Sequence, residues 1–242
     1  MASLVVVTGG SAGLGRALLE AAPEGSYRVD VSRSGPPPVA DEHVAADLGD
    51  PAAWKPVGQR IEQLIGQRQW TRVTLVHCAG TLEPIGFAGE VDSRDYTANL
   101  LVNAASSLAL GQRFLVAVAS AGSDARCELA LVSSGAARST YLGWSAYGAA
   151  KAAGDQWVRV VGAEQQERGG VRVLSVAPGV VATGMQAMIR DTDPHDFPAV
   201  EKFRELYETG ALTDPADAAA AFWRVLDDDE VLTGSVVDLR DR

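Results

Sequence analysis

The 242-residue chain has only two cysteines, Cys78 and Cys127. Two thiols cannot form a disulfide framework, and no Cys-x-x-Cys pair is present that would indicate a zinc site. Basic residues are also few: 21 lysines and arginines against 31 aspartates and glutamates give a formal net charge of −10. Because an acidic chain repels the phosphate backbone, the charge argues against a nucleic-acid partner.

Long hydrophobic runs are absent as well. No apolar run approaches the roughly 18 residues that a membrane-spanning helix needs. The opening sequence, Met-Ala-Ser-Leu-Val-Val-Val-Thr, has no basic segment followed by a long apolar core, as a signal peptide would. We therefore expect a cytoplasmic protein with no membrane partner. The composition, 47% hydrophobic and 21% charged, is typical of one globular domain that needs neither disulfide nor metal.

Short apolar segments rich in β-branched residues alternate with longer segments rich in alanine and leucine. Several short segments are apolar throughout, which is typical of strands covered on both faces, and the longer ones have helical spacing. This alternation predicts a single Rossmann-type domain over residues 1–242, an α/β fold with a doubly wound sheet of about seven parallel strands and helices on both faces. The expected strands are Leu4–Thr8, Tyr27–Ser32, Val44–Asp47, Val73–Cys78, Leu129–Ser133, Val171–Ala177 and Val236–Leu239. The expected helices are Leu14–Ala22, Pro51–Arg68, Asp92–Ala121, Ser145–Arg168 and Pro215–Leu226.

Residues 183–212 interrupt the alternation with helical fragments around a polar turn, Asp191–Asp196. Insertions of this kind often close over a substrate, so we expect a small helical substrate lid here. The aspartates and His195 of the turn could be drawn as a metal site, but aspartate is favoured at helix caps and turns. We therefore predict no metal.

The first expected strand leads into a glycine-rich turn, Thr8-Gly9-Gly10-Ser11-Ala12-Gly13-Leu14-Gly15, and a helix follows. Glycine permits positive φ and close approach of a ligand to the backbone, and the N–H groups of a helix N-terminus bind phosphate. At the first strand of an α/β chain, this pattern predicts a dinucleotide-binding turn rather than an ordinary connection.

The second expected strand ends Asp30-Val31-Ser32-Arg33. A carboxylate at this strand end would bind the ribose 2′-hydroxyl of NAD, whereas an arginine accommodates the 2′-phosphate of NADP. Ser32 at the end, followed by Arg33, favours NADP(H). Asp30 lies two residues earlier on the same strand face and is the competing signal for NAD.

Tyr147 and Lys151 are four residues apart at the start of an expected helix and therefore share one helix face. A cation beside the phenol would lower the pKa of the tyrosine and make it a usable acid at neutral pH. Ser134 follows the preceding strand, at the edge where ligands bind in open α/β sheets, and its hydroxyl could hydrogen-bond a carbonyl oxygen. No Gly-x-Ser-x-Gly motif surrounds it, so an esterase is not indicated.

Together these motifs resemble those of the short-chain dehydrogenases/reductases, over essentially the whole chain. The resemblance implies the family's catalytic tetrad, which matches Asn99, Ser134, Tyr147 and Lys151. The chain departs from the family at residues 77–80, His-Cys-Ala-Gly, where Asn-Asn-Ala-Gly is usual; we expect Cys78 to be a buried thiol. The motifs and the resemblance predict these cofactor-binding residues: Gly9, Ser11, Gly13, Leu14, Gly15, Ser32, Arg33, Asp47, Leu48, Ala79, Gly80, Tyr147, Lys151, Pro178, Gly179, Val181 and Thr183.

A narrower resemblance links the second half of the chain to the sepiapterin reductases and the bacterial benzil reductases. It implies that Trp144 and Met185 lie in the substrate pocket and that Asp238 anchors a pterin ring. A surface carboxylate at a strand end is the alternative for Asp238. The segments that carry the likeness are Gly143-Trp144, Thr183-Gly184-Met185-Gln186, Glu208–Leu212 and Gly234–Asp238.

The resemblance implies an NADPH-dependent carbonyl reductase. Its substrate would be a small-molecule carbonyl compound, an aromatic or pterin-like ketone or vicinal dicarbonyl. Tyr147 would donate a proton to the carbonyl oxygen, Ser134 would orient it, and Lys151 with Asn99 would support the proton transfer. Two alternatives stay open. One is an NAD-dependent alcohol dehydrogenase, if Asp30 binds the ribose; the other is a nucleotide-sensing module without turnover, which has no need of Tyr147 beside Lys151.

The resemblance also implies a homodimer or homotetramer. The pairing helices would be Asp92–Ala121 and Ser145–Arg168, where small residues would permit close packing. These small residues are Ala149, Ala150, Ala153 and Gly154.

Overall fold

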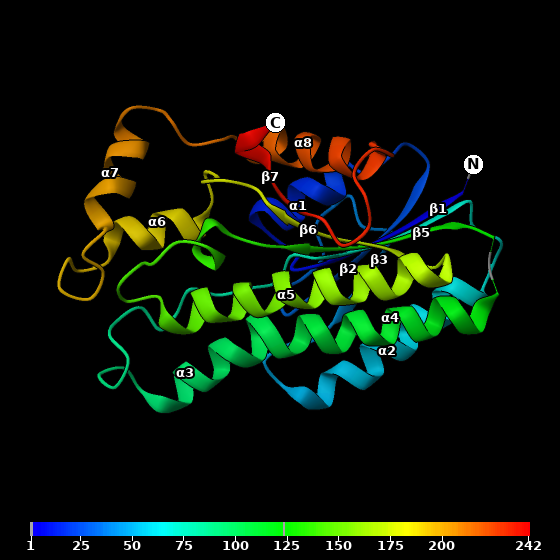
Figure 1. Ribbon diagram of the computed structural model, residues 1–242, viewed down its shortest axis with the longest axis horizontal. Helices are drawn as coiled ribbons and strands as arrows, with labels where there is room; N and C mark the ends of the chain where they lie inside the picture. Colours follow the sequence, from blue (N-terminus) through cyan, green and yellow to red (C-terminus); the bar gives the residue numbers. More distant parts are fainter. Residues whose placement is uncertain (1, 123) are drawn as a thin grey trace.

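The computed structural model describes residues 2–122 and 124–242. Seven parallel strands form one sheet in the order β3-β2-β1-β4-β5-β6-β7, with helices on both faces (Figure 1). This arrangement confirms the predicted doubly wound Rossmann-type fold. The strands are β1 Ser3–Thr8, β2 Ser26–Ser32, β3 Glu42–Ala45, β4 Arg72–His77, β5 Arg126–Val132, β6 Arg172–Ala177 and β7 Val236–Asp238.

The helices form two layers around the sheet (Figure 1). Helices α1 (Gly13–Glu20) and α8 (Pro215–Asp227) cover one face, and α2 (Pro51–Gly66), α4 (Ser106–Ala121) and α5 (Ser145–Arg168) cover the other. One expected helix is divided: the segment predicted as Asp92–Ala121 consists of α3 (Ser93–Leu100), a π-helical turn η1 (Leu101–Ala105) and α4. The π-helical turn adds a residue to the helix, and such turns often occur at functional sites.

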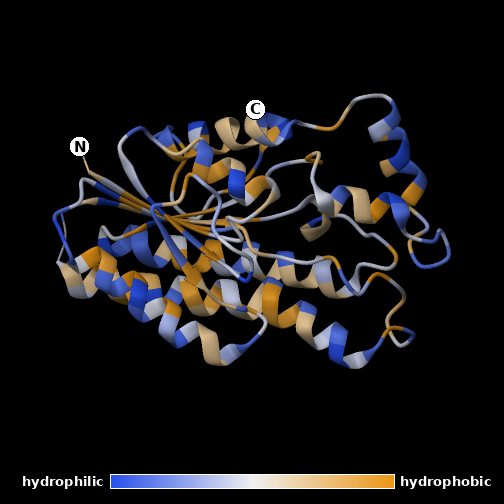
Figure 2. Cartoon of the chain, turned by 180° about the vertical axis from the view of Figure 1, so that it is seen from behind, coloured by the Kyte–Doolittle hydropathy of each residue, from blue (hydrophilic) through white to orange (hydrophobic). Residues whose placement is uncertain are grey.

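Both faces of the sheet are apolar because successive side chains of a strand point to opposite sides. In β1, Leu4 and Val6 pack in one cluster with Phe114 of α4, whereas Val5 and Val7 pack in another with Phe222 of α8. Figure 2 shows these hydrophobic strands between helices whose outer faces are largely hydrophilic. Continuous apolar runs such as Leu4–Val7 are therefore expected for buried parallel strands.

The strand order reverses between β1 and β4, because the chain runs outward through β2 and β3 before returning to β4. A crevice forms outside the carboxyl ends of the strands at such a point. Each predicted motif follows one of these carboxyl ends, so the topology gathers motifs that are far apart in the sequence.

Helices α6 (Gly184–Asp191) and α7 (Val200–Glu208) lie beyond the carboxyl edge of the sheet, at the left of Figure 1. The helical fragments expected within residues 183–212 are thus present. Ile189 of α6 and Phe203 of α7 belong to a third apolar cluster, together with Trp144 and Tyr147. In the polar turn, the backbone N–H of His195 donates to Asp193 Oδ1 at 2.8 Å, and no metal-binding group is found in the part of the chain that the structure describes.

By length and composition alone, the segment Ser93–Ala121 is apolar enough to cross a membrane. Only 39% of its most apolar window is buried, so an apolar surface remains on this helix. The segment packs against α2 and α5 and places Asn99 at the crevice.

Candidate active site

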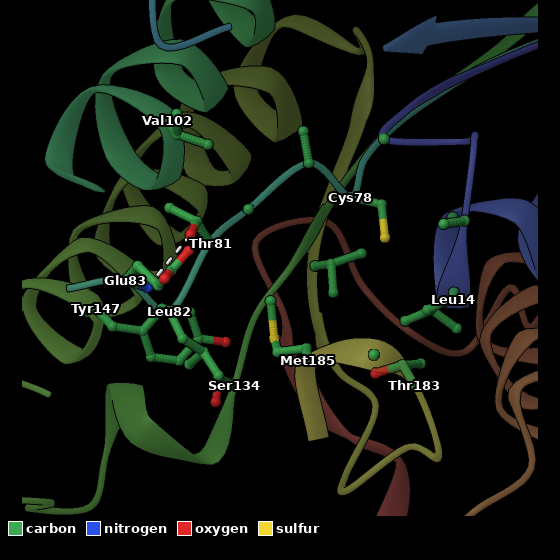
Figure 3. A pocket seen from close by; sticks show the side chains of 18 of the residues that line it. Leu14, Cys78, Thr81, Leu82, Glu83, Val102, Ser134, Tyr147, Thr183 and Met185 are labelled. Atoms are coloured by element: carbon green, nitrogen blue, oxygen red, sulfur yellow. Dashed lines mark hydrogen bonds between the residues drawn. The ribbon is translucent and has the colours of Figure 1, made fainter. Parts of the chain in front are cut away.

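A cavity of about 980 Å³ follows the carboxyl edge of the sheet from the end of β2 to α6 and α7. Every residue predicted to bind cofactor or substrate or to take part in catalysis lines this cavity, except Asp238. Figure 3 shows Leu14, Cys78 and Thr183 around the same space as Ser134, Tyr147 and Met185. One cavity therefore has a nucleotide-binding end, at the glycine turn, and a second end that carries the hydroxyl groups of Ser134 and Tyr147.

The glycine turn brings the backbone of the β1 end close to other backbone segments. Gly9 has φ +71°, and a Cβ at this position would lie 2.9 Å from Ala79 Cα; a Cβ on Gly15 would overlap the carbonyl oxygen of Gly9. The N-cap of α1, Ala12, provides no side-chain hydrogen bond, and no acidic residue lies in the first turn. The N–H groups of that turn remain available, and they fit the diphosphate of a dinucleotide.

At the end of β2, the competing signal Asp30 is turned away from the cavity. Its carboxylate is fully buried, and its Oδ2 lies 2.7 Å from Ser32 Oγ and 2.8 Å from His43 Nδ1. A Cβ on Gly10 would lie 2.6 Å from the other oxygen, Oδ1, so the carboxylate sits beneath the glycine turn. Arg33, in contrast, lines the cavity and forms no ion pair with any residue in the described ranges.

The segment after β4, where the chain departs from the family pattern, is held by other groups. Thr8 Oγ1 accepts hydrogen bonds from the N–H groups of Cys78 and Ala79, both at 3.1 Å. Desolvation raises the pKa of Cys78 to about 11, so this residue is a thiol at neutral pH. It is not the fully buried core residue that the sequence predicted, because it is partly exposed and lines the cavity. His77 Nε2 lies 3.1 Å from Ser106 Oγ, which donates to the carbonyl oxygen of Val102.

Burial, together with the charge of Lys151, lowers the pKa of His77 to about 3. The unfolded chain protonates a histidine near pH 6.5, so His77 contributes stability above that pH, and this contribution is lost as the pH falls from 6.5 toward 3. At about pH 5 the loss should reach about 2 kcal/mol. In His77→Asn, the difference in unfolding free energy between about pH 7 and about pH 5 should shrink by that amount.

Urea unfolding at the two pH values measures this difference. His195→Asn is the matched control. The side chain of His195 is 80% exposed, so this substitution should leave the difference in unfolding free energy between the two pH values unchanged. If the difference in unfolding free energy between the two pH values is the same in His77→Asn as in the wild type, the interpretation of His77 as a neutral buried histidine is wrong.

Ser134 and Tyr147 bring two hydroxyl groups together at the substrate end of the cavity. Ser134 follows β5, Tyr147 lies in the first turn of α5, and Figure 3 shows both side chains pointing into the same space. Tyr147 and Lys151 are buried, at 7% and 8% exposure. Water is therefore largely excluded from the groups that would handle a proton.

The pKa of Tyr147 is raised, chiefly by burial, and a hydrogen bond with Ser134 opposes this shift. Burial lowers the pKa of Lys151. Lys151 Nζ donates to the carbonyl oxygen of Val132 at 2.8 Å and lies 5.7 Å from the Tyr147 ring centroid. That Lys151 lowers the pKa of Tyr147 stays a prediction.

Asn99 lines the cavity, but its amide is occupied by backbone: Nδ2 donates to the carbonyl oxygens of Thr81 and Glu83. Asn103, which the sequence reasoning missed, accepts from Thr81 N–H at 3.1 Å and donates to the Thr81 carbonyl oxygen and to Asn99 Oδ1. A Cβ on Gly80 would lie 2.7 Å from Asn103 Oδ1 and 3.8 Å from Lys151 Nζ. Asn103 is thus the asparagine beside Lys151, and the available signal was a second asparagine one turn after the first.

Aromatic side chains line the cavity beside Tyr147. Trp144 and Met185 line the cavity together with Tyr141, and the Trp144 ring stacks on Phe197 at a centroid distance of 4.4 Å. Phe197 itself is fully buried behind Trp144. Neither Phe197 nor Met188 is among the residues that line the cavity, so Phe197 belongs to the core, whereas Met188 is 39% exposed.

Asp238, at the end of β7, does not line the cavity. Its carboxylate is buried and accepts hydrogen bonds from Arg240 Nε at 2.9 Å, Arg240 Nη2 at 2.6 Å and Arg138 Nη2 at 2.7 Å. These bonds hold the pKa of Asp238 below its ordinary value. An anchoring role toward a substrate remains a prediction, and it would require this ion pair to open.

The model of the short chain dehydrogenases matches residues 3–194, and the chain belongs to this family. It is therefore an oxidoreductase that uses a nicotinamide cofactor and acts on an alcohol or carbonyl group.

Relatives of known activity match over most of their length. A benzil reductase, (S)-benzoin forming, from Bacillus subtilis is 32% identical over 93% of this chain and 93% of its own length. A sepiapterin reductase from Mus musculus is 31% identical over 81% of this chain and 74% of its own. A short-chain dehydrogenase/reductase structure from Saccharomyces cerevisiae superposes with a TM-score of 0.83 at 25% identity, covering 99% of this chain and 96% of that one.

Proposed function

We propose that this protein is an NADPH-dependent carbonyl reductase that acts on an aromatic or pterin-like ketone or vicinal dicarbonyl. One observation carries the proposal: a single cavity holds the Ser134 and Tyr147 hydroxyls beside an aromatic wall at one end and, at the other, an Arg33 that has no ion-pair partner among residues 2–122 and 124–242. The names of the relatives, benzil reductase and sepiapterin reductase, support the same class of substrate.

Residues of this chain would donate the proton and stabilise the charge that develops on the carbonyl oxygen. When bound, the cofactor supplies the hydride. Tyr147 donates its proton to the carbonyl oxygen as general acid, and the Ser134 hydroxyl donates a hydrogen bond to the same oxygen where negative charge develops. Lys151, whose Nζ lies 5.7 Å from the Tyr147 ring centroid, would return a proton to Tyr147. The Asn103 amide, which lies near Lys151 across Gly80, is fully used in hydrogen bonds to Thr81 and Asn99 and would hold this segment in place.

The preference for NADPH rests on the opposite placements of Asp30 and Arg33. A carboxylate that is fully buried beneath the glycine turn cannot accept hydrogen bonds from a ribose in the cavity. The guanidinium of Arg33 lies in the cavity wall, and it would form charge-assisted hydrogen bonds with a 2′-phosphate. The NAD-dependent alternative would require Asp30 to leave its partners Ser32 and His43.

A screen of carbonyl compounds tests the proposal directly. Purified protein is mixed with NADPH and, in turn, benzil, isatin, sepiapterin and aliphatic diketones, and the loss of NADPH absorbance is followed. We expect turnover with at least one aromatic or pterin substrate, and slower turnover with NADH. Tight NADPH binding without any turnover would favour a nucleotide-sensing module, and faster oxidation of alcohols with NAD would favour the dehydrogenase.

We also propose a cytoplasmic homodimer that pairs through α4 and α5. Ala149 and Ala153 are exposed on α5, while Ala150 and Gly154 are turned inward, so only the first two are free to pack against a second chain. Val160, two turns further along the same face, is 48% exposed, and Val116 of α4 is 51% exposed. Sedimentation velocity should show a dimer, and a monomer would contradict this pairing.

A further inference from the structure

Arg240 is a cavity residue that the sequence did not indicate. It lies in the 3-10 turn η3 (Leu239–Asp241) directly after β7 and lines the cavity. A Cβ on Gly179 would lie 3.2 Å from its Cγ, and a Cβ on Gly135 would lie 3.4 Å from its Nη2. The side chain therefore extends over the ends of β6 and β5 and reaches the residue next to Ser134. Its position depends on both neighbours being glycine.

Two arginines share one buried carboxylate at this end of the cavity. Arg138 and Arg240 both pair with Asp238, and the neighbouring carboxylate of Asp241 adds a Coulombic attraction to Arg240. The side chain of Arg240 is 58% exposed, whereas that of Asp238 is 1% exposed. Arg240 is thus the partner of this ion pair that solvent and ligands can reach.

One edge of the Arg240 guanidinium is left for a ligand. Asp238 occupies the side formed by Nε and Nη2, and Nη1 has no partner among the residues that the structure describes. A guanidinium can hold a second carboxylate end-on through its two terminal nitrogens. The other charged residues that line the substrate end are Lys151, which is buried beside Tyr147, and Glu83 and Asp95, which are exposed and lie on the wall formed by the β4 loop and α3.

Arg240 is too far along the sheet to serve the phosphates of a nucleotide. β7 is four strand positions from β1, whose glycine turn receives the diphosphate, and five from β2, which leads to Arg33. At a spacing of about 4.8 Å between strands, the end of β5 that the guanidinium reaches is two strand positions, roughly 10 Å, from β1 and three, roughly 14 Å, from β2. The guanidinium therefore lies nearer to Ser134 than to the glycine turn or to Arg33.

We propose that Arg240 binds an anionic group of the substrate, so that the preferred substrates are carbonyl compounds with a carboxylate beside the carbonyl, such as aromatic 2-oxo acids. This inference rests on the proposed reductase function and narrows its substrate class. The carbonyl carbon gains a hydride from NADPH and its oxygen gains a proton from Tyr147, giving a 2-hydroxy acid and NADP⁺, while the carboxylate is unchanged. A pterin N–H group, by contrast, would find the Asp238 carboxylate already occupied by two arginines.

The test compares benzoylformate with its methyl ester, which differ in charge but share the reacting ketone. Wild-type kcat/KM should be higher for the acid, and raising the salt concentration should reduce this preference. Arg240→Met keeps an unbranched apolar side chain over Gly179 and should lower the acid-to-ester ratio of kcat/KM about 10- to 100-fold, as loss of a charged hydrogen bond does. Arg138 also pairs with Asp238 but does not line the cavity. Arg138→Met should therefore leave the acid-to-ester ratio of kcat/KM unchanged.

Equal losses for acid and ester in Arg240→Met, or a wild-type preference for the ester, would overturn the inference. Neutral benzil reports separately on the proposed reductase function. If no carbonyl compound is reduced, that function fails. Calorimetric binding of benzoylformate to the NADP⁺-saturated protein then decides the inference: binding that is lost in Arg240→Met and kept in Arg138→Met supports it, and any other pattern overturns it.

Discussion

Replacement of Tyr147 by phenylalanine should lower kcat for carbonyl reduction about 10²–10⁴-fold, because the general acid is lost. The ring itself should stay in place, since it packs edge-on against Trp144 at a centroid distance of 5.6 Å and belongs to the third apolar cluster, with Ile189 and Phe203. The variant should therefore still bind NADPH. Steady-state kinetics with benzil, together with fluorescence titration of NADPH, measures both effects.

Tyr27→Phe is the matched control for this experiment. It removes the same hydroxyl from a tyrosine that pairs with Glu42, on the strand β2 and far from Ser134 in the sheet order. Its kcat should remain close to that of the wild type. Turnover by Tyr147→Phe at a similar rate would show that another group delivers the proton.

Arg33→Ala should weaken NADPH binding about 10- to 100-fold, the usual effect of removing a charged hydrogen bond, while NADH binding changes little. The guanidinium has no competing ion pair within the described residues, so its loss frees no buried charge and should leave the fold intact. Dissociation constants for both cofactors, measured at two salt concentrations, check this expectation, because exposed charge pairs weaken as salt increases.

Arg168→Ala, in the last turn of α5, removes the same charge away from the cavity and should alter neither constant. A wild-type protein that binds NADH more tightly than NADPH would contradict the role of Arg33. In that case Asp30 would have to leave Ser32 and His43 and reach the ribose.

Two local features of the sequence correctly indicated most of the site. Apolar runs such as Leu4–Val7 predict strands buried on both faces, and these strands are present. The four-residue spacing of Tyr147 and Lys151 places both on one face of α5, and both line the cavity. Each inference succeeds because backbone geometry repeats over a few residues, so a short stretch of sequence is sufficient.

Four outcomes depended on partners that are distant in sequence. Asp30 pairs with His43, His77 is kept neutral by burial and by the charge of Lys151, Asn103 lies near Lys151 across Gly80, and Asp238 is occupied by Arg138 as well as by its near neighbour Arg240. The π-helical turn η1 shifts the helix register at Asn103, and no periodicity in the sequence predicts this turn.

The sequence by itself therefore determined the strands, the glycine turn and the residue types of the proton-handling group, since these follow from local spacing. Only the tertiary structure decided which charged groups are paired within the protein, as Asp30 and Asp238 are. It also decided that Arg33 has no ion-pair partner among the described residues and that Arg240, although paired with Asp238, keeps its Nη1 without a partner among them. The physical reason is that a charged group is neutralised by whichever partner the packed fold brings within hydrogen-bond distance, and the 100 residues between Arg138 and Asp238 give no local sign of that contact.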